Sequence, residues 1–177
     1  MEVTRKNILI TGAPGTGKTT FIKRLLQELR NFHPVGFYTA ELRKGGQRRG
    51  FAMKGVDGRE GILAHVEFQS PFKVGRYSVD VAGFDDFIRS IAFLDPAIRL
   101  IILDEIGKME CFSENFRRCV REILDSDKCV IATIALKGGG LIAEIKRRPD
   151  IFLVELTRHN QEALFAEIVK IAATYSI

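Results

Sequence analysis

The hydrophobic and polar positions of this chain follow two alternating patterns, and their order predicts the fold class. Strand-like apolar runs occur at 7–12, 35–42, 100–105, 129–134 and 151–155. Apolar positions at helical spacing occur at 17–31, 84–92, 113–124, 141–148 and 164–172. The run at 100–105 has no polar alternation before its two final carboxylates, which is typical of a central parallel strand covered on both faces. Alternating strands and helices predict an α/β fold with a doubly wound, mostly parallel sheet, whose ligand site lies at the carboxyl ends of the strands.

Residues 43–83 differ from the rest of the chain in glycine content and in the length of their apolar runs. They contain eight glycines between short strand-like pieces at 51–54, 62–68 and 77–81. We expect an antiparallel β-meander inserted after the strand at 35–42. Because a segment this short and rich in glycine is marginal alone, it is expected to pack on the core. One domain over residues 1–177, with the insertion at about 43–83, is therefore expected.

Local signals predict where the helix after this insertion begins and ends. Asp85 and Asp86 are expected in its first turn, where the helix dipole favours acidic side chains. The pair Asp95-Pro96 is expected to end the same helix, because the residue before a proline is biased away from helical conformation.

One stretch carries a specific chemical signature. The sequence Gly12-Ala13-Pro14-Gly15-Thr16-Gly17-Lys18-Thr19 follows the first apolar run and opens the first helix, which is the order of a P-loop. Its glycines allow a tight turn that aims several backbone N–H groups at one anion, and the helix N-terminus adds partial positive charge. We expect Lys18 to reach the β- and γ-phosphates of a nucleotide and Thr19 to offer its hydroxyl to Mg²⁺.

A second half of the site is expected where the run at 100–105 ends. Asp104 follows four apolar residues, the Walker B pattern, in which the carboxylate holds the same Mg²⁺ as Thr19. Glu105 is the candidate general base that activates a water for attack on the γ-phosphorus; the alternative is a capping or ion-paired acid. Lys108 is placed to neutralise transition-state charge, and the alternative is an ordinary exposed lysine.

Composition and charge narrow the class of protein. The net charge of +5 favours a polyanionic ligand, a requirement that nucleoside triphosphates and nucleic acids both meet. Cys111, Cys119 and Cys129 have no CxxC spacing and no even count, so neither a disulfide framework nor a zinc site is expected. The sequence has no run of 18 apolar residues and no signal segment at residues 1–6, so we expect a cytoplasmic protein without membrane contact.

The string Asp104-Glu105-Ile106-Gly107-Lys108-Met109-Glu110, together with the P-loop, resembles the small P-loop nucleoside-triphosphatases typified by the cancer-related and thermophilic enzymes. Shorter matches at 36–39, 49–51, 74–77, 79–80, 133–134, 137–138 and 154–160 extend the resemblance over the whole chain. It implies slow, Mg²⁺-dependent hydrolysis of nucleoside triphosphates (ATP, GTP, CTP and UTP) to diphosphate and phosphate, with low selectivity for the base. It also implies that the nucleotide is contacted by the P-loop and by Leu103, Asp104, Glu105, Ile106, Gly107, Lys108, Met109 and Glu110.

Two positions depart from this resemblance. Family members often have Leu where this chain has Cys111, which is a change in packing. Gln161 stands where Arg is expected, and this leaves a base or phosphate contact from that position open. Next to it, His159 and Asn160 follow the last strand, where many P-loop proteins seat the base, and Asn160 is equally suited to cap the following helix.

An arginine that reaches the γ-phosphate would accelerate hydrolysis by roughly 10³ to 10⁵. Arg147 and Arg148 follow the glycine loop at 138–140 and are the best-placed candidates, with Arg49 behind them. If none of the three reaches the phosphate, unassisted turnover is expected to be slow.

Two other classes of function share the P-loop. A nucleotide or small-molecule kinase would need an arginine-rich lid and an acceptor pocket, which the segment at 43–83 is able to supply. A nucleotide switch or nucleic-acid-associated ATPase would bind RNA or DNA through basic pairs, but no recognition helix, aromatic RNA-binding signature or zinc pattern supports it. We expect a monomer that takes nucleoside triphosphates and does not bind nucleic acid.

Overall fold

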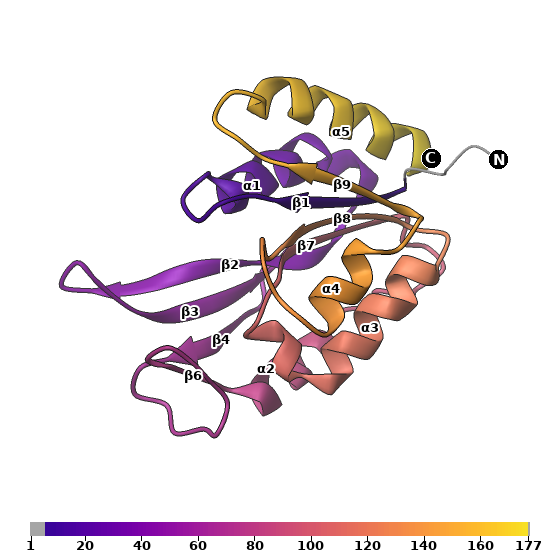
Figure 1. Cartoon of the computed structure of the whole chain (residues 1–177). Helices are drawn as coiled ribbons and strands as arrows, with labels where there is room; N and C mark the ends of the chain where they lie inside the picture. The colour runs from indigo at the N-terminus through magenta and orange to yellow at the C-terminus, as the bar shows by residue number, and fades with distance from the viewer. Residues whose placement is uncertain (1–5, 177) are drawn as a thin grey trace.

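The structure, a computed structural model, describes residues 6–176 and contains one continuous sheet of nine strands (Figure 1). The strand order is β5-β6-β4-β3-β2-β7-β8-β1-β9. The expectation about the N-terminal segment falls largely on residues 1–5, which lie outside the described residues. Strand β2 divides the sheet into two regions because it pairs with β7 in parallel and with β3 in antiparallel orientation.

Five neighbouring parallel strands form the parallel region. They are β2 (Val35–Lys44), β7 (Leu100–Ile106), β8 (Cys129–Ile134), β1 (Asn7–Thr11) and β9 (Ile151–Glu155). β1 and β8 are buried along their whole length, as expected for strands covered on both faces. This region confirms the predicted α/β, mostly parallel sheet.

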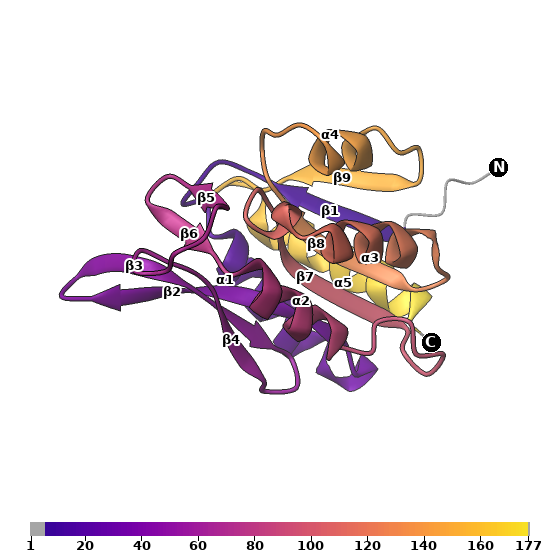
Figure 2. The same ribbon diagram turned by 90° about the horizontal axis from the view of Figure 1, so that it is seen from below.

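Helices cover both faces of the parallel region (Figures 1 and 2). One face carries α1 (Lys18–Glu28) and α5 (Gln161–Tyr175), and the other carries α2 (Val81–Arg89), α3 (Glu114–Asp125) and α4 (Leu141–Lys146). A helix layer on each face is the doubly wound arrangement that the alternating pattern predicts. No helix among residues 6–176 is both long enough and apolar enough to cross a bilayer.

Strand β7 shows how a continuous apolar run serves two cores. Successive side chains of a strand point to opposite faces of the sheet. Leu100 and Ile102 pack on the side of α1 and α5, whereas Ile101 and Leu103 pack on the side of α2, α3 and α4. All four are at most 1% exposed. Packing on both faces therefore fixes the strand whose last residues enter the candidate site.

The four strands beyond β2 form the antiparallel region. They are β3 (Gln47–Gly55), β4 (Glu60–His65), β6 (Tyr77–Val79) and β5 (Lys73–Val74). Each pairs antiparallel with its neighbour, so the insertion extends the main sheet and does not form a separate layer. The predicted antiparallel insertion is thus confirmed, and its β2–β3 hairpin projects at the left of Figure 1.

Gly36 lies where the two regions join. Its φ is +138°, and a Cβ at this position would lie 1.8 Å from the carbonyl oxygen of Ile102 on β7. No side chain fits such a separation. Only glycine therefore lets β2 approach β7 closely enough to form the parallel pairing that sets Gly36 opposite Ile102.

Helix α2 begins earlier than its apolar stripe indicates. Its N-cap is Asp80, whose carboxylate accepts a hydrogen bond at 2.9 Å from the backbone N–H three residues later. Asp85 and Asp86 therefore lie beyond the first turn, and their predicted placement there is wrong. The helix also ends at Arg89, well before the predicted stop at 95–96.

The other boundaries shift by a few residues. α1 ends at Glu28, and a short 3₁₀ turn, Arg30–Phe32, replaces its last predicted turn. β2 continues to Lys44 because its hairpin partner β3 begins only at Gln47. α4 ends at Lys146, before the predicted end at 148. The predicted order of strands and helices is unaffected.

Candidate active site

The P-loop connects the end of β1 to the start of α1. Gly15 and Gly17 have φ values of +79° and +88°, left-handed conformations that glycine adopts without strain. Gly17 is the N-cap of α1, and no side chain in the described part of the chain caps this helix. The N–H groups of the first turn and the helix dipole are therefore directed at the loop, the arrangement that binds phosphate.

Side-chain hydrogen bonds hold the P-loop in shape. Lys18 Nζ donates to the carbonyl oxygens of Gly12 at 2.8 Å and Ala13 at 3.3 Å, and Thr16 Oγ1 donates to Ala13 at 2.8 Å. From the start of α5, Gln161 Nε2 donates to the Thr16 carbonyl oxygen at 3.1 Å. Position 161, where the sequence departs from the family pattern, therefore supports the loop backbone in this chain.

Asp104 is the point where the P-loop helix and two strands meet. Thr19 Oγ1 donates to Asp104 Oδ2 at 2.7 Å, and Thr133 Oγ1 donates to Asp104 Oδ1 at 2.6 Å. The carboxylate is 1% exposed, so these two donors offset the cost of burying it. The structure thus brings Thr19 and Asp104 together. Thr133 falls in the short family match at 133–134 but received no role from the sequence, because only the strand order, with β8 beside β7, brings it to Asp104.

Two further carboxyl groups converge beside Gly107. A Cβ at that position would lie 2.6 Å from Glu105 Oε1 and 2.8 Å from Glu110 Oε2, so the glycine leaves the space that both occupy. Burial raises the pKa of Glu105, the charge of Asp104 raises it further, and Lys18 lowers it. Burial, assisted by Glu105, raises the pKa of Glu110 to about 8. Glu110 is therefore mostly protonated at neutral pH and able to donate a hydrogen bond.

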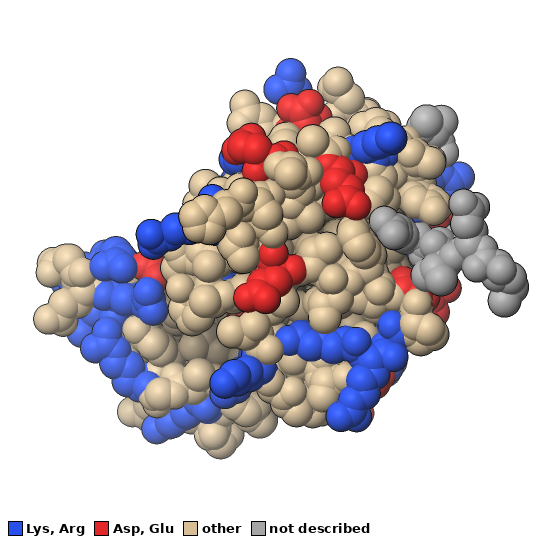
Figure 3. Space-filling model, turned by 45° about the horizontal axis from the view of Figure 1, so that its top comes forward, with Lys and Arg blue, Asp and Glu red and all other residues tan. Residues whose placement is uncertain are grey.

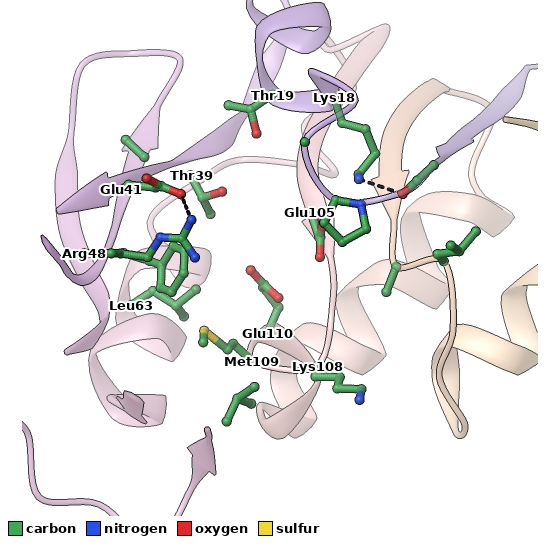
Figure 4. Close-up of a pocket in the computed structure, with 18 of the residues that line it drawn as sticks. Lys18, Thr19, Thr39, Glu41, Arg48, Leu63, Glu105, Lys108, Met109 and Glu110 are labelled. Carbon is green, nitrogen blue, oxygen red and sulfur yellow. Dashed lines mark hydrogen bonds and ion pairs between the residues drawn. The ribbon is translucent and has the colours of Figure 1, made fainter. Parts of the chain in front are cut away.

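A cavity of about 980 Å³ opens in front of the P-loop (Figure 4). The predicted nucleotide-contacting residues that line it are Gly12, Pro14, Gly15, Lys18, Thr19, Glu105, Lys108, Met109 and Glu110. Lys18 and Thr19 lie at one end of this cavity, and Lys108 is exposed and lies at the other end. The structure therefore places the P-loop and the residues after β7 on one continuous surface.

The remaining predicted contacts do not line the cavity. They are Ala13, Thr16, Gly17, Leu103, Asp104, Ile106 and Gly107. Leu103 and Ile106 are at most 1% exposed and pack in the core beside α2 and α3. Their side chains anchor the strand that carries Asp104 and Glu105, so any nucleotide contact from these two positions is left to their backbone.

The opposite wall of the cavity belongs mainly to the antiparallel region. It is formed by Thr39, Ala40 and Glu41 of β2, Arg48 and Phe51 of β3, Leu63 of β4 and Val74 of β5. The parallel pairing of β2 with β7 ends where Phe37 lies opposite Leu103, and Thr39 follows two residues after this last pair on β2. Thr39, Phe51 and Val74 fall in the short family matches at 36–39, 49–51 and 74–77, but the sequence assigned them no role, because only the strand order shows that β2 lies beside β7.

Arg48 lies in the cavity wall, and the predicted arginines do not. The pairing of β2 with β3 shifts register at Arg49, whose side chain forms an ion pair with Glu67. Arg148 is held by two aspartates at 2.7 Å each, and Arg147 is exposed. Arg49, Arg147 and Arg148 do not line the cavity. The expectation that one of these three arginines is placed at the reacting phosphate is therefore wrong for this geometry.

The loop after β9 uses its polar groups internally. Asn160 Oδ1 accepts a hydrogen bond from the Thr157 backbone N–H at 2.8 Å, and Asn160 Nδ2 donates to the Glu155 carbonyl oxygen at 2.8 Å. Asn160 stands at the N-cap position of α5, but its side chain makes no capping hydrogen bond to that helix. The capping prediction is wrong in this respect, because both polar groups of the side chain close the loop.

The oxygen atoms at Thr19 and Asp104 suit a small divalent cation. Mg²⁺ prefers hard oxygen ligands, and P-loop enzymes supply them from a hydroxyl, a Walker B carboxylate and the substrate phosphates. The hydroxyl and the carboxylate lie 2.7 Å apart at the start of α1, where the phosphates are expected. The chemistry of these donors therefore fits Mg²⁺.

Comparison with known proteins identifies the family. A family profile described as NTPase matches residues 7–169. The chain belongs to the NTPase family. Similar proteins in this family include the nucleoside-triphosphatase THEP1 of Thermotoga maritima, 45% identical over 165 residues that cover 93% of this chain and 94% of the relative. The cancer-related nucleoside-triphosphatase of Homo sapiens is 35% identical over 180 residues, covering 93% and 95% of the two chains.

Solved structures in the family agree with the fold. The crystal structure of THEP1 from Aquifex aeolicus superposes with a TM-score of 0.81 at 36% identity, covering 94% of this chain and 98% of that one. The solution structure of the human cancer-related nucleoside triphosphatase gives a TM-score of 0.80 at 32% identity, covering 95% and 97%. The resemblance found in the sequence, and the P-loop fold that it implies, are confirmed.

Proposed function

We propose that this protein hydrolyses nucleoside triphosphates to diphosphate and phosphate, with Mg²⁺ and with little selectivity for the base. The observation that carries the proposal is the 2.7 Å contact between the Thr19 hydroxyl and the Asp104 carboxylate, beside a P-loop and with Glu105 in the adjoining cavity. Relatives from Thermotoga maritima and Homo sapiens that bear the name nucleoside-triphosphatase support the same reaction.

The P-loop is the proposed phosphate site. The first-turn N–H groups of α1 and the Lys18 ammonium supply positive charge around one anion. Lys18 Nζ lies 2.8 Å from the Gly12 carbonyl oxygen, and its flexible stem allows the ammonium to reach the β- and γ-phosphates. Gln161 supports the same loop through its hydrogen bond to Thr16.

Thr19 and Asp104 are the proposed metal ligands. When bound there, Mg²⁺ neutralises charge on the β- and γ-phosphate oxygens. The Thr133 hydroxyl donates a 2.6 Å hydrogen bond to the second Asp104 oxygen, which orients the carboxylate toward Thr19.

Glu105 is the proposed general base. The oxygen of a water forms a bond to the γ-phosphorus, and the bond from that phosphorus to the bridging oxygen breaks, leaving its electron pair on the diphosphate. The Glu105 carboxylate takes the proton that the water loses. Burial raises the pKa of Glu105, which increases its affinity for this proton. Lys108, at the far end of the cavity, stays a predicted contributor to charge neutralisation.

The loop after β9 supports low selectivity for the base. The loop follows the last strand, where many P-loop proteins seat the base, and Asn160 is one of its polar residues. Both polar groups of Asn160 are already bonded to backbone atoms of their own loop. A side chain occupied in this way is poorly suited to distinguish one base from another.

The experiment that tests the proposal measures phosphate release from ATP, GTP, CTP and UTP, with and without Mg²⁺, and without an acceptor. Glu105→Gln keeps the shape of the side chain and removes the base. We expect hydrolysis to fall roughly 10²- to 10⁴-fold, with the Kd for nucleotide nearly unchanged. Glu155→Gln is the matched control because it also lies at the end of a parallel strand but does not line the cavity. It should hydrolyse like the wild type.

Each part of the proposal fails separately. Full turnover by Glu105→Gln would exclude Glu105 as the base. Phosphate release that needs no divalent cation would exclude the metal assignment, and release from one nucleotide alone would exclude low base selectivity. Nucleotide binding without any release would contradict hydrolysis and favour the kinase or switch class.

A further inference from the structure

Arg48 has unused hydrogen-bonding capacity in the cavity wall. A guanidinium carries five N–H donors. Arg48 uses one terminal nitrogen in an ion pair with Glu41, and its Nε is buried without a hydrogen-bond partner among residues 6–176. A buried donor without a partner costs free energy. The Arg48 side chain lines the cavity and is 40% exposed, so its terminal N–H groups are able to meet an acceptor on a ligand there.

Neighbouring residues hold Arg48 in this position. The Arg76 guanidinium donates to the Arg48 carbonyl oxygen at 2.5 Å, which fixes the backbone. The Arg48 Cζ lies 5.5 Å from the centre of the Phe51 ring, a cation–π distance that orients the guanidinium. Glu41 also forms an ion pair with Arg43 at 2.7 Å, so it divides its charge between two arginines. The guanidinium is therefore oriented without being fully neutralised.

The place of Arg48 in the cavity is opposite the P-loop. Figure 4 shows Arg48 and Glu41 on one side and Lys18 on the other, with Glu105 and Glu110 between them. In a P-loop enzyme the γ-phosphate is the end of the triphosphate that lies nearest the general base. A nucleotide bound to the P-loop therefore directs its γ-phosphate toward the side of the cavity that Arg48 faces.

The charge of the cavity favours an anionic group at this place. Its charged lining residues are Lys18, Lys23, Arg48, Lys108 and Lys137 on the basic side and Glu41, Glu105 and Glu110 on the acidic side. Figure 3 shows that Lys and Arg side chains also gather at the projecting end of the molecule, over the β2–β3 hairpin that carries Arg48. Since Arg48 is the arginine on the wall facing the P-loop, it is the forked donor best placed for phosphate oxygens.

We propose that Arg48 is a further catalytic residue, whose guanidinium contacts the γ-phosphoryl oxygens while the bond to the leaving diphosphate breaks. It stabilises the negative charge that develops on those oxygens and on the bridging oxygen. This inference rests on the proposed function. It makes the antiparallel region a part of the catalytic machinery, because β3 supplies a charge that the parallel region lacks at this place.

The test compares Arg48→Ala and Arg48→Lys with Arg49→Ala. Arg49 is the matched control because it has the same charge, is the next residue on the same strand, and pairs with Glu67 away from the cavity. At saturating ATP and Mg²⁺ we expect kcat of Arg48→Ala to fall roughly 10³-fold or more, because an arginine at the γ-phosphate is worth roughly 10³ to 10⁵ in rate. Arg48→Lys should lie between Arg48→Ala and the wild type, and Arg49→Ala should match the wild type.

A binding measurement separates catalysis from folding and from ground-state binding. The probes are ADP alone and ADP with aluminium fluoride, which imitates the γ-phosphoryl group in the transition state. Arg48→Ala should bind ADP like the wild type and lose roughly tenfold or more in affinity for ADP with aluminium fluoride. Thermal melting of all variants shows whether each is folded.

The inference is overturned if Arg48→Ala turns over at the wild-type rate, or if it binds both probes as well as the wild type does. It is also overturned if affinity for ADP falls as much as kcat, because Arg48 would then bind the ground state equally. Failure of the proposed function is recognised by a different result, because the wild-type protein itself would then release no metal-dependent phosphate. The aluminium fluoride comparison still decides the role of Arg48 in that case.

Discussion

The parallel and antiparallel regions of the sheet differ in how clearly their sequences indicate a function. In the parallel region helices cover both faces, and the apolar runs of β1 and β7 lead directly into the P-loop and the Asp104-Glu105 motif. In the antiparallel region β3 mixes buried and half-exposed positions without a regular pattern, and its cavity residues Arg48 and Phe51 carry no chemical motif such as a P-loop. Chemistry that depends on a fixed backbone shape leaves a motif in the sequence, whereas a wall built from scattered side chains does not.

The joint between the regions is the place where the structure is easiest to break. Gly36→Ala would place a Cβ 1.8 Å from the Ile102 carbonyl oxygen at a φ of +138°. We expect a loss of about 4 kcal/mol or more in the free energy of unfolding, because β2 must separate from β7. Urea denaturation measures this loss. Gly139→Ala is the control, since no atom lies within 4 Å of the position where its Cβ would be.

The number of transitions in the unfolding curve of Gly36→Ala shows whether the two regions of the sheet unfold together. A single transition in Gly36→Ala would show that the two regions unfold together. Two transitions, with nucleotide binding kept through the first, would show that the parallel region is stable without its extension. A loss as small as that of the Gly139 control would contradict the close approach of β2 and β7.

The stability of the protein should depend on pH through Glu110, which lines the cavity between the two regions. Glu110 has a pKa of about 8 in the folded protein, whereas an unfolded glutamate titrates near 4.3. Between these values the unfolded chain loses the proton and the folded protein keeps it, so stability is present at low pH and is lost as the pH rises to about 8. Glu110→Gln cannot ionise. We expect wild-type stability to fall by about 2 to 4 kcal/mol more than that of Glu110→Gln between pH 4 and pH 9.

Urea denaturation at several pH values measures this difference, and Glu122→Gln is the control because that residue is exposed on α3. The groups that act on Glu110 are Glu105 and Asp104, which raise its pKa, and the backbone N–H groups of Glu110 and Gly107, which lower it. Parallel pH profiles for wild type and Glu110→Gln would show that Glu110 is ionised in the folded protein.

The smallest expected effect lies within the parallel region. Gln161→Ala removes the 3.1 Å hydrogen bond to the Thr16 carbonyl oxygen and leaves the phosphate-binding groups in place. We expect the Kd for ADP to rise about fivefold, the value of one neutral hydrogen bond of about 1 kcal/mol. Calorimetry measures it, with Gln27→Ala on the exposed side of α1 as the control. An unchanged Kd would mean that the P-loop holds its shape without Gln161.

The sequence alone predicts the parallel region of the sheet better than it predicts the contacts between strands. The order of elements, the P-loop and the end of β7 were predictable because backbone conformation, helix polarity and apolar periodicity each leave a local signal. The contact of Thr133 with Asp104 was not, because it depends on β8 lying between β1 and β7. Arg48 was not among the arginine candidates for a related reason, since only the folded hairpin shows which of two adjacent residues lines the cavity.

The lengths of the two outermost strands bear on self-association. An unpaired strand edge offers a row of backbone N–H and C=O groups to which another chain can add. At one edge β5 has 2 residues, so a foreign strand would gain few ladder hydrogen bonds there. At the other edge β9 has 5 residues and includes Leu153, which is 40% exposed. If this protein aggregates by strand addition, growth is therefore expected at β9, and a lysine at position 153 is the substitution that should oppose it.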